Sequence, residues 1–160
     1  PDIEVGLSGG DYWFSPNGRE LVAYEPGQND IRRIDLASGR EIGRWQLPAG
    51  VGVARAFWSP DSGGLLVTGD DFCAYHARLD APRLRAVRLQ GHTAEIMEAA
   101  FHPTRPYALT SSWDGSTRLW DLRNGRPLAQ LPRPCFHPRW TTDNRVGWTQ
   151  YDGAGRYRRG

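Results

Sequence analysis

The sequence predicts an all-β fold built from repeated antiparallel units, and three observations support this prediction. First, the 19 glycines and 12 prolines are scattered through the 160 residues and divide the sequence into short apolar runs of strand length. Second, no apolar pattern with the period of a helix is sustained along the chain. Third, two independent motifs recur at a common interval of 43 residues or a value close to it.

The expected strands are runs rich in β-branched and aromatic residues, bounded by residues that favour turns. The clearest runs are 20–24, 64–68, 107–112 and 117–120. Residues 93–100 are the best candidate for a helix, because Ile96, Ala99 and Ala100 have roughly helical spacing. Pro103 and a preceding glycine leave room for barely two turns, so we predict a strand here as well.

Two motifs define the repeat. An aromatic-x-Pro triplet occurs as Phe14-Ser15-Pro16, Trp58-Ser59-Pro60, Phe101-His102-Pro103 and Phe136-His137-Pro138, with prolines 44, 43 and 35 residues apart. Ile34-Asp35-Leu36 returns as Trp120-Asp121-Leu122 after 86 residues, which is twice 43. A period of about 40 to 45 residues with four strands in each unit is typical of β-propeller blades. We therefore predict radially arranged four-stranded blades, with each of these prolines following an innermost strand.

The best-matched repeat covers residues 89–125. Gly91-His92 stands 28 residues before Trp120-Asp121, and the turn Asp114-Gly115-Ser116 lies between them. These residues resemble a repeat of the WD40 family. The resemblance implies that four side chains form a hydrogen-bonded chain within the blade: His92, Thr110, Asp114 and Trp120. Such a chain pairs polar groups that would otherwise be buried without partners.

The other repeats depart from the WD40 pattern. Ile34-Asp35 stands in place of Trp-Asp in the first repeat, and Leu79-Asp80 ends the second. The repeat around Pro138 lacks the residues of the hydrogen-bonded chain. The chain of four side chains is therefore predicted in the third repeat alone.

Residues 1–160 are expected to form one β-propeller segment. Its approximate repeats are 1–47, 48–89, 90–131 and 132–160. Residues 2–6 are predicted to form an outer strand, and 156–159 a third strand that lacks an outer partner. The resemblance implies a ring of usually about seven blades, so material for about four predicts part of a larger ring. The remainder of the same chain or another copy would complete it, and a start at Pro1 without Met also favours a segment of a longer protein.

Charge and composition exclude several classes of function. The formal net charge is +2 and all 20 basic residues are arginines, so chemistry that needs a lysine amine, such as Walker A phosphate binding or Schiff-base catalysis, is excluded. The low net charge disfavours nucleic acid as a partner. Two cysteines do not make a disulfide framework, which favours a reducing, cytoplasmic location. No apolar run has the length of a membrane span.

Three candidate reaction or metal sites fail on their expected context. Gly6-Leu7-Ser8-Gly9-Gly10 has the spacing of a nucleophile elbow, but a strand rather than a helix is expected after it. Cys73-x-x-His76 and Cys135-x-His137 could suggest zinc. Strand alternation would point Cys73 and His76 to opposite sides, and the two pairs are expected in different blades. We therefore expect no enzyme activity, no metal and no cofactor.

Trp113 is the strongest candidate for an exposed binding residue, because an indole directly before a tight turn has no place in the core. By the resemblance, Glu95 and Met97 lie early in the innermost strand, on the same face of the disc. An indole, a thioether and a charge suit a protein or peptide partner. The sequence thus favours a non-catalytic interaction module, the scaffold or sensor part of a larger protein. The alternatives are that Trp113 covers a neighbouring loop and that the propeller is accessory to a hydrolase, kinase or nucleotide-switch enzyme.

Overall fold

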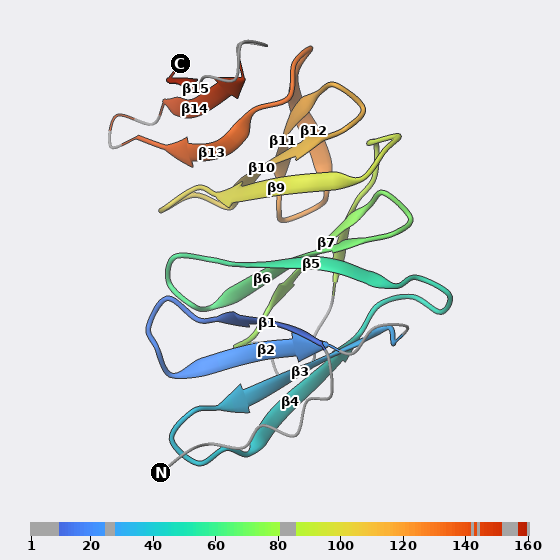
Figure 1. The fold of residues 1–160 in the computed structure, drawn as a ribbon, viewed down its shortest axis with the longest axis vertical. Helices are drawn as coiled ribbons and strands as arrows, with labels where there is room; N and C mark the ends of the chain where they lie inside the picture. The colour runs from blue at the N-terminus through green and yellow to red at the C-terminus, as the bar shows by residue number, and fades with distance from the viewer. Residues whose placement is uncertain are drawn as a thin grey trace.

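The computed structural model consists of four antiparallel sheets that follow one another along the chain (Figure 1). It describes residues 10–24, 28–80, 86–141, 143, 145–151 and 157–159. The first sheet contains β1 (Asp11–Phe14), β2 (Glu20–Tyr24), β3 (Asp30–Asp35) and β4 (Glu41–Gln46). The second contains β5 (Val53–Trp58), β6 (Gly64–Gly69), β7 (Ala74–Arg78) and β8 (Val87–Leu89). The third contains β9 (Ile96–Phe101), β10 (Tyr107–Ser112), β11 (Thr117–Asp121) and β12 (Arg126–Leu131). The fourth contains β13 (Phe136–Trp140), β14 (Val146–Tyr151) and β15 (Tyr157–Arg159).

The all-β prediction is confirmed. No helix is present among the described residues, and the helix candidate at 93–100 forms part of β9 instead. Strands pair with their sequence neighbours in every sheet, so each sheet is a meander that can form from local contacts.

Packing between sheets follows from side-chain alternation along the central strands. Every residue of β6 is buried, with Leu65 and Val67 in the core that the first two sheets share. Leu66, between them, joins the core shared with the third sheet. Successive side chains of a strand point to opposite faces, so one strand supplies two cores. The outer strands carry the exposed side chains, as in β12, where five of six positions are exposed.

The innermost strands place the sheets side by side as propeller blades. The strands β1, β5, β9 and β13 contact one another in that order. The described blades form an open array, with the first and the fourth sheet at opposite ends of it, rather than a closed ring (Figure 1). Meandering antiparallel sheets set side by side through their innermost strands are propeller blades, as the repeat predicts.

The 86-residue spacing is confirmed by equivalent turns. In the first sheet, Gly39 donates its backbone N–H to the Asp35 carbonyl at 2.8 Å, and in the third Gly125 does the same to Asp121 at 2.8 Å. Both glycines have positive φ, 68° and 75°. A left-handed residue at this point closes the turn, and glycine adopts it without steric cost.

The placement of Pro138 after an innermost strand is wrong. Pro16, Pro60 and Pro103 follow β1, β5 and β9, but Pro138 lies inside β13. The strand tolerates a proline there because its pairing with β14 shifts register between Phe136 and Arg139, and a proline without an N–H fits such an irregularity.

In the fourth blade, Trp140 takes the position that Trp58 has in the second blade. Its indole donates to the Ala100 carbonyl of β9 at 3.4 Å, just as Trp58 donates to the Trp13 carbonyl of β1 at 3.0 Å. The residues that close the following loops by backbone hydrogen bonds are Ser15, Ser59, His102 and Thr141, at intervals of 44, 43 and 39 residues. Only four residues separate β12 from β13, against six between β8 and β9, so the fourth repeat is shorter.

The assignment of Leu79-Asp80 to the Trp-Asp position is also wrong. Leu79 donates its backbone N–H to Gly63, as Leu122 donates to Pro106 in the next blade. Leu79 is therefore equivalent to Leu122, and Ala77 occupies the position of Trp120. Aligning the second repeat with the third by sequence alone gives a position two residues too late, because a Leu-Asp pair follows β7.

Two predicted strands concern the completion of the fourth blade and so of the ring: the third strand near the C-terminus and the outer strand at residues 2–6. β15 is its third strand, as predicted, and pairs with β14. The predicted outer strand at 2–6 lies outside the described residues. None of the described residues belongs to a helix with the length and hydropathy needed to cross a membrane.

Candidate interaction face and its polar support

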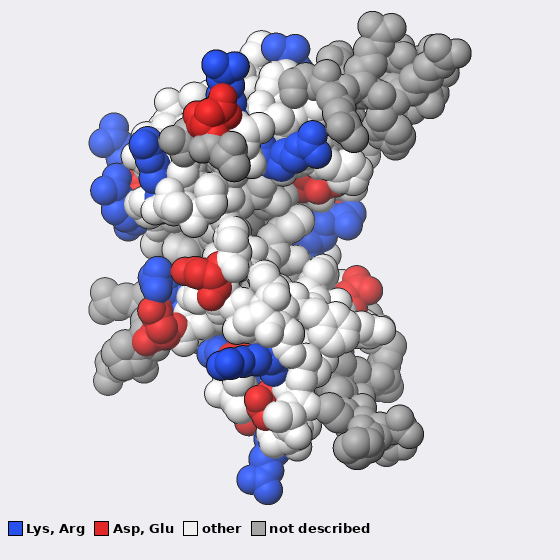
Figure 2. All heavy atoms as spheres, turned by 90° about the vertical axis from the view of Figure 1, so that its left-hand side faces the viewer, with Lys and Arg blue, Asp and Glu red and all other residues white. Residues whose placement is uncertain are grey.

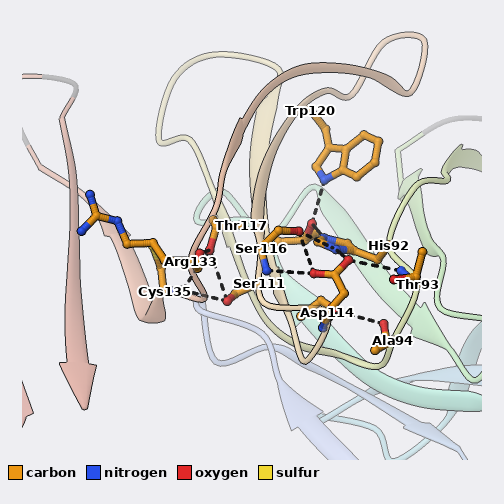
Figure 3. A network of polar contacts seen from close by, with 12 residues as sticks. His92, Thr93, Ala94, Ser111, Asp114, Ser116, Thr117, Trp120, Arg133 and Cys135 are labelled. Carbon is orange, nitrogen blue, oxygen red and sulfur yellow. Dashed lines mark hydrogen bonds and ion pairs between the residues drawn. The ribbon is translucent and has the colours of Figure 1, made fainter. Parts of the chain in front are cut away.

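The four side chains implied by the resemblance lie in one hydrogen-bonded chain within the third blade (Figure 3). The Trp120 indole N–H donates to Thr110 Oγ1 at 2.7 Å. Thr110 Oγ1 is 2.8 Å from His92 Nε2, and His92 Nδ1 is 2.7 Å from Asp114 Oδ2. The Trp120 indole can only donate and the Asp114 carboxylate can only accept. A neutral His92 with its proton on Nδ1, in keeping with its lowered pKa, lets every proton point the same way along the chain.

Burial explains the charge states of this chain. It lowers the pKa of His92 below its usual value, although the hydrogen bond to Asp114 acts in the opposite direction. Burial alone would raise the pKa of Asp114. Hydrogen bonds from Ser116, His92 and the Thr93 backbone outweigh it and bring that pKa to about 2. At neutral pH the chain therefore ends in a carboxylate that accepts hydrogen bonds from three residues.

The same turn fixes the connection that enters the third blade. Ser112 Oγ donates to the Ala94 carbonyl at 2.9 Å, and the Thr93 N–H donates to Asp114 Oδ2 at 3.2 Å. The connection between β8 and β9 is thus held by the turn between β10 and β11. This clamp is a second role of Asp114, which the sequence did not predict.

Two hydroxyl groups hold the connection that leaves the third blade. The Cys135 N–H lies 2.9 Å from both Ser111 Oγ and Thr117 Oγ1, and Thr117 Oγ1 also donates to the Arg133 carbonyl at 3.1 Å (Figure 3). Ser111 and Thr117 are buried and directly paired across β10 and β11. We call these two side chains the hydroxyl pair. It anchors the fourth blade to the third.

Replacing Thr117 by valine should lower the free energy of unfolding by about 1 kcal/mol. The shape is retained, but the Arg133 carbonyl loses its hydroxyl donor and the Cys135 amide keeps only Ser111. Hydrogen exchange followed by NMR should show faster exchange at the Cys135 amide. An exposed threonine offers the matched control, since Thr104→Val should leave that amide unchanged. Equal exchange in wild type and Thr117→Val would contradict the anchoring role.

Trp113 directly precedes Asp114 of this polar network, and 58% of its surface is exposed. Its ring meets the ring of Phe136 in the fourth blade edge to face, with centroids 6.1 Å apart. Its backbone N–H donates to the Glu95 carbonyl at 3.0 Å, which fixes the turn against the start of β9. Trp113 therefore both contacts a neighbouring blade and presents an indole face to solvent.

Glu95 and Met97 meet a residue of the second blade. Arg55 Nη2 lies 3.5 Å from Glu95 Oε1 and 3.9 Å from Met97 Sδ. Arg55 Nε is buried and has no hydrogen-bond partner among the described residues. Such an unpaired polar group is uncommon in a folded protein.

We refer to Arg55, Glu95, Met97, Trp113 and Phe136 together as the rim patch. Sequence analysis proposed three of its members and missed Arg55 and Phe136. Arg55 had a signal, because it is the one charged side chain in the otherwise apolar run of β5. Phe136 had been used as a motif residue and was placed in the wrong register.

The second blade solves the same turn with different residues. Asp71 Oδ2 accepts the Tyr75 hydroxyl at 2.6 Å and pairs with Arg88 Nη2 at 3.0 Å. Burial and the neighbouring Asp71 raise the pKa of Tyr75. A phenol and a guanidinium thus satisfy the carboxylate where the third blade uses histidine.

The histidines considered as zinc ligands make other contacts. His76 Nδ1 lies 3.3 Å from the Leu122 carbonyl, and His137 Nδ1 lies 3.5 Å from Glu98. Cys73 and Cys135 are buried free thiols. Within the described part of the chain, no three His, Cys, Asp or Glu side chains gather in a way that could hold a metal. Most of the Gly6–Gly10 motif lies outside the described residues.

Comparison with known proteins decides the family. A family model described as "WD domain, G-beta repeat" matches residues 84–121. The chain therefore contains a repeat of the WD40 family. The matched WD40 repeat contains the whole hydrogen-bonded chain from His92 to Trp120.

Curated WD40 relatives extend the similarity beyond this repeat. The chain is 33% identical over 123 residues to the ribosome biogenesis protein YTM1 of Podospora anserina, covering 72% of this chain and 25% of the relative. It is 28% identical over 120 residues to the periodic tryptophan protein 2 homolog of Dictyostelium discoideum, covering 73% and 13%. A 39-residue match to the small ribosomal subunit protein RACK1 of Trypanosoma brucei brucei is 44% identical, covering 24% and 12%. The aligned part of this WD40 chain thus spans a quarter of YTM1 and less of the others.

Proposed function

We propose that this WD40 segment is a non-catalytic protein-interaction module that binds a protein or peptide through the rim patch. The observation that carries the proposal is the half-exposed Trp113 indole, fixed by Glu95 and Phe136 on a rigid polar network. A pre-organised aromatic side chain loses little entropy on binding, and aromatic residues dominate the energetics of interfaces.

Arg55 adds polar specificity to the proposed interface. Its guanidinium faces Glu95 at a long 3.5 Å, with both side chains partly exposed. A partner carboxylate could replace this weak contact and pair with Arg55 in the desolvated interface. The preferred partner surface therefore combines an apolar pocket for Trp113 with an acidic group beside it.

The proposed setting is a larger protein assembly. Two of the relatives are named for ribosome biogenesis or a ribosomal subunit, so proteins of such particles are the first partners to test. Further blades from the same protein or another copy would complete the ring. The enzyme-accessory role and the cytoplasmic location stay predictions from the sequence.

Replacing Trp113 by alanine should weaken partner binding by about thirtyfold, the equivalent of 2 kcal/mol. Purified wild type and Trp113→Ala would be used to recover partners from the source lysate, with recovery quantified by mass spectrometry. Leu128→Ala is the matched control, because Leu128 is a 49% exposed apolar side chain on β12, away from the rim patch. It should recover the same partners as wild type.

The opposite result would move the interface. Equal recovery by wild type and Trp113→Ala, with loss on combined Arg156→Ala and Arg158→Ala, would assign binding to the arginine-rich terminal segment. Partner recovery would then also fall steeply with added salt, because exposed arginines act mainly through screened electrostatics.

A further inference from the structure

A groove opens between the second and third blades at the far end of β9 from the rim patch. Its volume is about 770 Å³, within the range of about 300 to 1,000 Å³ typical of ligand sites. β9 starts beside Glu95 and ends at Phe101, so the groove and the rim patch lie at opposite ends of the same strand. Figure 2 looks onto the side of the molecule where the β5–β6 and β9–β10 loops lie, and shows basic and acidic side chains interspersed over it.

The interior of the groove is largely apolar. Phe101, Val87 and Leu122 line it together with the His76 ring, which meets the Phe101 ring at 5.9 Å between centroids. Gly64 also lines the groove, beside His76. The space suits one apolar side chain, which would bury its surface against these residues.

The hydrogen-bonding groups around the groove are mainly donors. Arg78 and Arg123 each use Nε and Nη2 to hold one aspartate, which leaves three N–H groups of each guanidinium for a ligand. The Arg105 side chain makes no ion pair or hydrogen bond with the described residues. The acidic residue of the lining, Asp61, accepts hydrogen bonds from the Ser59 hydroxyl and the Gly63 N–H, both at Oδ1.

One histidine of the lining, His102, orders the loop that brings Arg105 to the groove. His102 Nδ1 accepts the backbone N–H groups of Thr104 and Arg105 at 3.1 and 3.0 Å, so this ring is neutral and fixes the loop that carries Arg105. Arg105 thus stands on an ordered loop rather than a free one. An ordered backbone reduces the entropy that the loop loses when Arg105 binds a carboxylate.

We propose that this groove is a second docking site, independent of the rim patch, for an extended peptide that places one apolar side chain between the blades and a neighbouring carboxylate on Arg105. Charge complementarity selects this occupant: the lining offers unused donors from three arginines, against one carboxylate whose Oδ1 is already engaged. A basic peptide would place its charge beside three guanidinium groups, and a purely apolar one would leave their donors without an acceptor from the ligand.

Binding of a designed peptide to the full chain tests the proposal. The probe is fluorescein-labelled Gly-Asp-Phe-Asp-Gly, followed by fluorescence polarisation, with two matched peptides in which the acids become Asn or the Phe becomes Ala. Binding of the acidic aromatic peptide should reach saturation. Each matched peptide should bind at least about tenfold more weakly. Equal binding of the Asn peptide would overturn the role of charge and with it the proposal.

Protein variants locate the site. Arg105→Glu should weaken binding of the acidic peptide at least about tenfold, whereas Arg40→Glu, at an exposed arginine in the β3–β4 turn of the first blade, should leave binding within about twofold of wild type. Trp113→Ala should also leave it unchanged, so this test can fail while the rim-patch proposal stands, and the reverse. In NMR spectra the peptide should shift the ring signals of His76 and His102 and not the Trp113 indole. Shifts at Trp113 alone, or identical binding by Arg105→Glu, would overturn the proposal.

Discussion

Replacing Trp120 by alanine should lower the free energy of unfolding by about 3–5 kcal/mol, the largest effect expected for a single residue. The Trp120 side chain is completely buried in the core shared by the second and third blades. Its removal leaves a cavity there and takes the indole N–H away from Thr110 Oγ1. Urea unfolding followed by circular dichroism measures the change.

Two further variants separate packing from hydrogen bonding. Trp120→Phe keeps most of the apolar contact but loses the N–H, so it should cost less than Trp120→Ala. His92→Ala should cost about 1–3 kcal/mol, because Asp114 and Thr110 would each lose a buried partner. If His92→Ala unfolded at the same urea concentration as wild type, the hydrogen-bonded chain would contribute nothing to stability.

Acidification between about pH 4 and pH 2 should remove the second-largest contribution to the free energy of unfolding, that of the Asp114 carboxylate. The pKa of Asp114 is about 2 in the folded protein, below its usual 3.8, so the folded state favours the carboxylate. Its contribution, equivalent to about 2 kcal/mol, is complete above pH 3.8 and disappears as the pH falls to 2. The lowered pKa of His92 acts in the same direction from pH 6.5 downward, because the unfolded chain takes up that proton more readily.

A comparison of asparagine variants isolates this effect. The stability difference between wild type and Asp114→Asn, measured by urea unfolding, should shrink by about 2 kcal/mol between pH 7 and pH 2. Asp143→Asn, in the exposed loop between β13 and β14, is the same substitution outside the hydrogen-bonded chain and serves as the reference variant. A difference between wild type and Asp114→Asn that stays constant over this range would show that Asp114 has the same pKa in both states.

The blade architecture was predictable because it rests on local signals repeated at one interval. Turn glycines, aspartates and the aromatic before each loop are dictated by backbone geometry within one hairpin. Their 43-residue spacing therefore appears in the sequence itself. Detail was predictable only in the third repeat, where the residues at both ends of the hydrogen-bonded chain are distinctive.

What failed depends on contacts between blades. Pro138 satisfied the local motif, yet the shorter β12–β13 connection moved the strand, so that Trp140 and not Phe136 donates to the preceding blade. Arg55 joins the rim patch across a blade boundary. Residues 40 apart in sequence meet in this way only when two sheets pack, and a single sequence carries no record of which pairs do so.

The hydroxyl pair and the Asp114 turn impose an order on folding during synthesis. Chains emerge from the ribosome N-terminus first, so early segments can fold before later ones exist. Residues 93 and 94 appear about twenty positions before the side chains that hold them and must remain unfixed until Ser112 and Asp114 emerge. Cys135 meets the reverse situation, since Ser111 and Thr117 are already present when it appears. The contacts that fix the connection entering the third blade therefore form late. The contacts that hold the connection to the fourth blade can form as soon as Cys135 has emerged.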